Sequence, residues 1–203
     1  ITFMSTISCM QKTYDTYSFG CRVNMAEMEA LYFQLINSGF QRKTDNPDIF
    51  IINTCAVTKK AEREARQLIY KMKKKMSGTI IVVTGCAATK WNIENIKVEG
   101  IDFLFDNTDK EYLANIIHHK MQFDTPFKGQ TLKGGQGKFL SSGRLLLKIQ
   151  DGCHRFCTFC IVPYLRGQPK SKSIIEIINT IHSYCHPEFI CLVGKTGFGI
   201  SIN

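Results

Sequence analysis

The chain has 203 residues, enough for one large domain or two modest ones with a substantial core. Hydrophobic residues make up 44% of it and charged residues 21%, a composition that excludes an intrinsically disordered chain. Lys and Arg number 26 against 17 Asp and Glu, so the formal charge of +9 indicates either a polyanionic partner such as nucleic acid or simply a basic surface.

Strands and helices are predicted to alternate along the first part of the chain. Runs such as DIFIINT and TIIVVTG are continuously apolar, which is typical of strands buried in a parallel sheet. Four strands are predicted, at 13–19, 48–54, 79–85 and 101–105. Three helices are predicted, at 24–39 with Asn24 and Glu27 as a capping box, at 58–76 and at 109–121. This alternation predicts an α/β fold with a parallel, Rossmann-like or flavodoxin-like sheet.

A second region is predicted after residues 122–142, a stretch rich in Gly, Ser and Lys that has the composition of a linker. Strands are predicted at 144–150 and 188–194, with a helix between them that begins near Ser173 and has Glu176 as its capping partner. We therefore divide the chain into four parts: an N-terminal extension (1–12), a first domain (13–121), the linker and a second region (143–203).

The cysteine content bears on compartment and chemistry. No apolar run reaches the roughly 18 residues of a membrane span, and the first residues lack the basic and apolar regions of a signal peptide. We therefore expect a cytoplasmic protein without a membrane partner. In that compartment, nine cysteines indicate metal binding or catalysis more than disulfides.

Three of these cysteines, Cys21, Cys55 and Cys86, each follow a predicted strand; we refer to them as the first cysteine set. The carboxyl ends of parallel strands lie along one edge of a sheet, where open α/β folds bind their ligands. Three thiols that are far apart in the sequence could therefore converge on one point. The alternative is that each is an ordinary small buried residue.

The second cysteine set, Cys153, Cys157 and Cys160, forms a C-x3-C-x2-C pattern within DGCHRFCTFCIVP. A structural zinc site has four protein ligands, usually in two separated pairs. Three cysteines can instead hold three irons of a cubane cluster and leave the fourth iron open to a small molecule. A zinc site completed by His154 or Cys185 is the alternative.

The second set and its surroundings, LLLKIQDGCHRFCTFCIVPYLRG, resemble the radical S-adenosylmethionine (radical SAM) methylthiotransferases. The first domain agrees with this resemblance, because the family's N-terminal elements are matched by GCRVN (20–24), NTC (53–55) and GC (85–86). INTCAVTKKAEREARQ and LKIQDGC are most similar to the branch that acts on N6-threonylcarbamoyladenosine in tRNA. The resemblance covers about residues 13–190.

The resemblance implies a transferase with two [4Fe-4S] clusters. The second cysteine set would hold the cluster whose open iron binds S-adenosylmethionine (SAM), with Phe159 and Gly194 beside that cofactor. The first set would hold an auxiliary cluster that carries the sulfur to be inserted. One electron would cleave SAM to a 5′-deoxyadenosyl radical, which would abstract hydrogen from C2 of the modified adenosine next to the anticodon. The implied partners are tRNA and an electron donor such as flavodoxin or ferredoxin; nothing in the sequence predicts the oligomeric state.

Basic residues indicate where RNA would lie. Four of them surround the second set and are predicted to contact phosphates: Arg155, Arg166, Lys170 and Lys172. The run 59–75 carries eight basic and two acidic residues, and is either a further RNA contact or a solvated helix face.

The second region is shorter than a radical SAM barrel, since a complete eight-unit barrel takes about 250 residues. We therefore expect the incomplete start of a partial β/α barrel, in a C-terminally truncated chain. Three other functions stay open: a noncatalytic iron–sulfur or metal-binding module, a methylthiotransferase for another modified adenosine or a ribosomal protein, and a zinc-stabilised RNA-binding protein.

Overall fold

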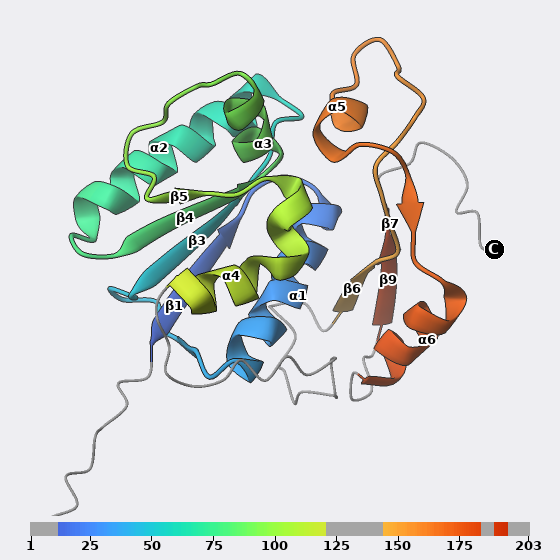
Figure 1. Cartoon of the computed structure of the whole chain (residues 1–203), viewed down its shortest axis with the longest axis horizontal. Coiled ribbons are helices and arrows are strands. Elements are labelled where there is room, and N and C mark those ends of the chain that lie inside the picture. Colours follow the sequence, from blue (N-terminus) through green and yellow to red (C-terminus); the bar gives the residue numbers. More distant parts are fainter. Residues whose placement is uncertain (1–11, 121–143, 184–188, 195–203) are drawn as a thin grey trace, which may run out of the picture.

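The computed structural model describes residues 12–120, 144–183 and 189–194. Within them, the larger part is a parallel sheet with helices on both faces (Figure 1). Its strands are β1 (Thr13–Ser18), β2 (Gln41–Arg42), β3 (Ile49–Thr54), β4 (Ile80–Gly85) and β5 (Phe103–Leu104). Their order is β2-β1-β3-β4-β5, with parallel pairing throughout. This is the order of flavodoxin-like sheets, so the predicted α/β fold is confirmed.

Helices cover both faces of the sheet, and β3 is buried at every position. Ile49 and Ile51 belong to one core, with residues of α1 and α4, whereas Phe50 and Ile52 belong to the other, with residues of α2 and α3. The described helices of this part are α1 (Arg22–Asn37), α2 (Lys59–Lys75), α3 (Cys86–Ile93) and α4 (Leu113–Lys120), with the 3-10 helix η1 (Asn107–Tyr112) before α4. Alternate side chains of one strand thus hold both helical layers.

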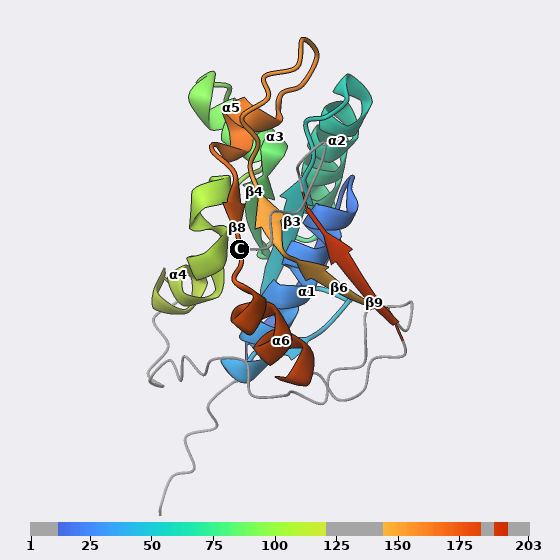
Figure 2. The same cartoon turned by 90° about the vertical axis from the view of Figure 1, so that its right-hand side faces the viewer.

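The second region packs beside the first domain (Figures 1 and 2). Its described elements are β6 (Arg144–Lys148), β7 (Gln150–Asp151), α5 (Val162–Arg166), β8 (Lys170–Ser171), α6 (Ile174–Ser183) and β9 (Phe189–Val193). Strands β6 and β9 pair in parallel, and β7 pairs with β8 in antiparallel fashion. Val193 and Leu146 pack on Val23 and Ala26 of α1. Helix α1 is therefore shared between the sheet and the second region.

Helix starts show where local patterns succeed and fail. Thr58 caps α2 by accepting a hydrogen bond from the N–H of Ala61 at 3.1 Å, and Ser173 and Glu176 form the reciprocal pair predicted for α6. The prediction of a capping box at Asn24 and Glu27 is wrong. Helix α1 begins at Arg22 with Cys21 as its N-cap, so both residues are inside the helix.

Other boundaries differ in detail. The structure adds α3, α5 and the short strands β2 and β8, which the sequence patterns did not predict. The linker at 122–142 and nearly all of the extension at 1–12 lie outside the described residues, so the proposed division into domains stays a prediction. Among the described helices, none combines the length and apolar character needed to cross a membrane.

Candidate metal centre

The first cysteine set lies at the carboxyl edge of the sheet. Cys21 directly precedes α1, Cys55 follows β3, and Cys86 is the first residue of α3, directly after β4. Because β1, β3 and β4 are neighbours in the sheet, these three positions share one edge. Cys21 and Cys55 flank the boundary between β1 and β3, where the strand order reverses and where doubly wound folds bind ligands. Cys55 and Cys86 are buried, and Cys21 is partly exposed.

Glycines before the cysteines allow close backbone approach at this edge. Gly20 has φ of +89°, and a Cβ there would lie 2.5 Å from Cβ and 2.6 Å from Sγ of Cys55. Gly85 has φ of +103°, and a Cβ there would collide with the backbone of Thr54. Both positions therefore require glycine for two separate reasons, the backbone conformation and the lack of space.

The second cysteine set lies in the loop between β7 and α5. The N–H of Cys153 donates to the carbonyl of Gly167 at 3.0 Å, and the N–H of Cys160 donates to that of Cys157 at 2.9 Å. Cys153 is buried, Cys157 is exposed and Cys160 is intermediate. Phe156 has φ of +45°, a left-handed conformation that bulky residues rarely adopt. Strained positions of this kind gather at functional sites.

A cavity lies at the second cysteine set and reaches the segment that follows Cys55. It has a volume of about 470 Å³. Val57, two residues beyond Cys55, lines it from the first domain, and residues 157–162 line it from the second region. Phe159 is 99% exposed at this cavity, so its ring is available to a ligand. Gly194, the other predicted cofactor residue, follows β9, and a Cβ added there would lie 3.3 Å from Cβ of Gln150.

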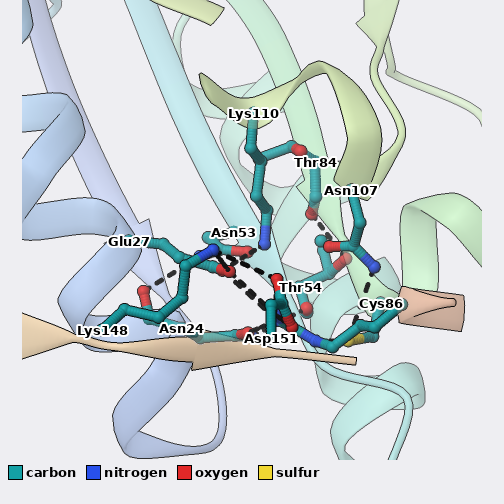
Figure 3. A network of polar contacts seen from close by, with 12 residues as sticks. Asn24, Glu27, Asn53, Thr54, Thr84, Cys86, Asn107, Lys110, Lys148 and Asp151 are labelled. Atoms are coloured by element: carbon teal, nitrogen blue, oxygen red, sulfur yellow. Dashed lines mark hydrogen bonds and ion pairs between the residues drawn. The ribbon is translucent and has the colours of Figure 1, made fainter. Parts of the chain in front are cut away.

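A buried network of charges joins the two regions beside Cys86 (Figure 3). Glu27 of α1 is at its centre and forms ion pairs with Lys110, Lys148 and Arg166. Burial alone would raise the pKa of Glu27, but these three cations hold that pKa well below its ordinary value. The carboxylate of Asp151 forms ion pairs with Nζ of Lys148 at 3.1 Å and with Nη1 of Arg166 at 2.8 Å. The network therefore contains charged groups from α1, η1, β6, β7 and α5.

Arg166 connects this network to the first cysteine set. Its Nε lies 3.3 Å from Sγ of Cys86, and its Nη2 donates to Oδ1 of Asn24 at 2.8 Å. Asn24 in turn donates to the carbonyls of Phe19 and Thr54, both at 2.9 Å, just before Gly20 and Cys55. Burial alone would lower the pKa of Arg166, but Glu27, Cys86 and Asp151 raise it above its ordinary value.

The predicted RNA residues divide into two groups. Arg155, Lys170 and Lys172 are exposed, and their contact with RNA stays a prediction. Arg166 has no exposed side-chain surface, and each of its three guanidinium nitrogens donates to a protein partner. We therefore withdraw Arg166 from the RNA candidates. No local sequence pattern indicates that Arg166 is buried and paired, because its acidic partner Glu27 is 139 residues away in the sequence.

The chemistry of both cysteine sets fits iron–sulfur clusters, since soft thiolate ligands favour iron–sulfur and zinc sites. Across 12–120, 144–183 and 189–194, no three His, Cys, Asp or Glu side chains are grouped closely enough to hold a metal ion. A [4Fe-4S] cluster binds each thiolate through a different iron, so the donor type and the common sheet edge fit such a cluster.

Comparison with known proteins gives a consistent picture. Residues 13–106 match a family described as uncharacterized protein family UPF0004. The chain is 31% identical over 182 residues to the threonylcarbamoyladenosine tRNA methylthiotransferase MtaB of Aquifex aeolicus, covering 85% of this chain and 44% of that protein. It is 38% identical over 168 residues to the protein of the same name from Rickettsia prowazekii, covering 79% of this chain and 38% of that protein.

Over about four fifths of its length, the chain is therefore similar to proteins named tRNA methylthiotransferases. It is also similar to the tRNA-2-methylthio-N(6)-dimethylallyladenosine synthase of Petrotoga mobilis, with 33% identity over 180 residues, covering 82% of this chain and 40% of that protein. The chain thus spans less than half the length of these curated relatives. Identities to the two differently named groups of relatives are similar, so identity alone does not choose between their substrates.

Proposed function

We propose that the chain carries the two cysteine sites of a tRNA methylthiotransferase that acts on N6-threonylcarbamoyladenosine beside the anticodon. The observation that carries this proposal is that the first cysteine set shares one edge of the sheet, while a second three-cysteine loop lines a cavity together with Val57 of the first domain. The names of four relatives with 31% to 38% identity support the choice of nucleoside. The expected cytoplasmic location stays a prediction.

In this proposal, the first cysteine set holds the auxiliary [4Fe-4S] cluster and the second set holds the SAM-binding cluster. When bound, these groups supply the electron that cleaves SAM and the sulfur that is inserted. The protein's own residues hold the sites in place: the glycines at the sheet edge let the strand ends approach, and Phe159 offers an exposed ring to the cofactor. Flavodoxin or ferredoxin remains the expected electron donor.

The tRNA would contact the exposed basic residues of the second region and those of α2. Lys59, Arg63, Tyr70 and Lys74 are exposed, and their spacing along the helix places them on one stripe. Three other cations of α2 are paired, Lys60 with Glu64, Arg66 with Glu62 and Lys73 with Asp102. We define the α2 stripe as residues Lys59, Arg63, Tyr70 and Lys74; it begins beside Val57 at the cavity and has the charge to follow an RNA backbone.

The test is the amount of iron and sulfide per chain after anaerobic reconstitution. It uses the chain and two triple-Ala variants, one for each cysteine set. About eight irons, falling to about four in either variant, would support two independent cubane clusters. Stoichiometric zinc without iron would overturn the proposal and leave a structural metal protein.

A second measurement separates an enzyme from a noncatalytic module. The reconstituted chain is reduced with dithionite in the presence of SAM, and 5′-deoxyadenosine is measured by chromatography. Formation of 5′-deoxyadenosine that is lost in the variant of the second set supports the enzyme. Full iron content without SAM cleavage favours the noncatalytic iron–sulfur module for this chain.

A further inference from the structure

One dipeptide, Arg166–Gly167 at the end of α5, contacts both cysteine sets. The carbonyl of Gly167 accepts the N–H of Cys153 at 3.0 Å, and the side chain of Arg166 reaches Sγ of Cys86 at 3.3 Å. Cys153 belongs to the second set and Cys86 to the first. The two sets are therefore linked through a single short segment of backbone.

The guanidinium of Arg166 is fixed in position by its other partners. Its Nη1 donates to Glu27 at 2.7 Å and to Asp151 at 2.8 Å and 3.0 Å, and its Nη2 donates to Asn24. These bonds use the planar geometry of the group, which lysine cannot reproduce. Nε of Arg166 is directed at Sγ of Cys86. Its orientation is set by Glu27 and Asp151, which hold the rest of the guanidinium in place.

The same group also reaches the other two members of the first set indirectly. Asn24 accepts from Arg166 and donates to the carbonyls of Phe19 and Thr54, and Thr54 directly precedes Cys55. Thr54 Oγ1 donates to the carbonyl of Thr84, which lies just before Gly85 and Cys86. Asn24 thus connects Arg166 to the ends of β1 and β3, and Thr54 connects β3 to β4.

We propose that Arg166 is a positioning residue that couples the two cysteine sites, by donating a charged hydrogen bond to the Cys86 sulfur while its neighbouring peptide holds Cys153. This inference rests on the proposed role of the first set as iron ligands. Hydrogen bonds to cluster sulfurs and nearby charge set the reduction potential of such a site, and outer partners of ligands tune metal affinity. Loss of the Arg166 donor therefore makes the first site harder to reduce and weakens iron binding.

The experiment compares Arg166→Gln, Arg166→Lys and the unsubstituted chain, each in the background where the second set is replaced by Ala. The readouts are iron content, iron affinity in competition with a chelator, and the reduction potential followed by absorbance and electron paramagnetic resonance. Arg166→Gln is expected to bind iron about 10- to 100-fold more weakly and to shift the potential to a more negative value. Arg166→Lys keeps the positive charge but lacks the planar guanidinium. Its iron affinity and reduction potential are expected to lie between those of Arg166→Gln and the unsubstituted chain.

Lys148→Gln is the matched control. Lys148 has ion pairs with Glu27 and Asp151 in the same network, but no hydrogen bond of Lys148 to a cysteine is found among the described residues. A purely structural role for Arg166 predicts that both Gln variants lower the unfolding midpoint and leave the potential of the first site unchanged. That result, with iron bound, would overturn the inference and leave the proposed ligand set intact.

Coupling is measured in the chain that keeps both sets. Loading the second set should change the potential of the first site in the unsubstituted chain and in Lys148→Gln, and should have no effect in Arg166→Gln. An equal change in all three would overturn the coupling. Absence of iron from the unsubstituted first set would instead overturn the proposed ligand set, and the inference with it.

Discussion

The two cysteine sets are held in opposite ways. The first set is placed by a sheet: its members follow neighbouring strands, and two of the three are buried. The second set is placed by a loop, in which Cys157 is exposed and Phe156 is in a left-handed conformation. A sheet edge fixes positions through its core, whereas a loop depends on a few hydrogen bonds and neighbouring contacts. The first site should therefore respond to changes in packing, and the second to changes in local contacts.

The largest effect on the free energy of unfolding should come from Gly85→Ala, which places a side chain at the crowded edge of the sheet. The substitution combines an unfavourable φ with a collision against the backbone of Thr54, so we expect a loss of about 4 kcal/mol in the free energy of unfolding. Gly39→Ala is the control, because Gly39 also has positive φ but has open space where a Cβ would be. It should cost about 1 kcal/mol. Equal losses in urea titrations would contradict the role of crowding at the edge.

The next effect tests the buried network between the two regions. Glu27→Gln removes the charge that three cations surround, and breaking a buried pair costs about 3 kcal/mol or more. Glu64→Gln removes an exposed partner of Lys60 on α2 and should cost about 0.4 kcal/mol. Thermal unfolding of both variants gives the comparison. A Glu27→Gln variant as stable as the unsubstituted chain would mean that the network contributes no net stability.

A smaller effect concerns the RNA surface. The double variant Lys59→Gln, Lys74→Gln should bind an anticodon stem-loop about 10-fold more weakly at moderate salt, and reduce the slope of log K against log salt by about 2. Lys43→Gln with Lys97→Gln removes the same charge from exposed lysines outside the α2 stripe and is expected to change little. Fluorescence anisotropy measures both. Equal weakening would indicate a general effect of net charge, and binding to anionic vesicles with equal affinity would favour a membrane surface.

The smallest effect is a dependence on pH at Glu29, where β6 meets α1. Burial raises the pKa of Glu29 to about 7, although the N–H of Leu146 donates to its carboxylate at 3.2 Å. Because the folded chain keeps a proton that the unfolded chain releases, this group lowers stability as the pH rises from about 4.5 to about 7. Glu29→Gln should raise stability at pH 8 by about 1 kcal/mol and leave it unchanged near pH 4. A gain at both pH values would contradict titration as the cause.

Much of the fold could be predicted because the residues that determine each strand are adjacent in the sequence. Continuous apolar runs such as IFIINT and IIVVTG identify β3 and β4, and the positions of Cys55 and Cys86 follow from where these strands end. The site's supporting residues could not be predicted in the same way. Asn24 and Glu27 have the residue types of a helix cap, yet both are inside α1 and serve buried contacts to distant parts of the chain.

Trp91 and Arg166 are further residues whose buried contacts could not be predicted from the sequence nearby. Trp91 is fully buried and donates from Nε1 to Glu62 at 2.7 Å, a partner 29 residues earlier in the chain. Arg166 looked like one of several basic residues beside a loop. Its burial depends on Glu27 and Asn24, which lie 139 and 142 residues earlier, and on Asp151. Only the folded chain brings these partners together.

The contact between Arg166 and Glu27 also has a consequence for the order in which the protein is built. Synthesis completes the first domain's sheet and its four helices before α5 emerges, and domains fold as units from the N-terminal side. Until β6 and α5 have both emerged, Glu27 lacks at least one of its three cationic partners, and Cys86 has no guanidinium neighbour before α5. The first cysteine set is thus assembled as an open surface, and the arrival of the second region covers it.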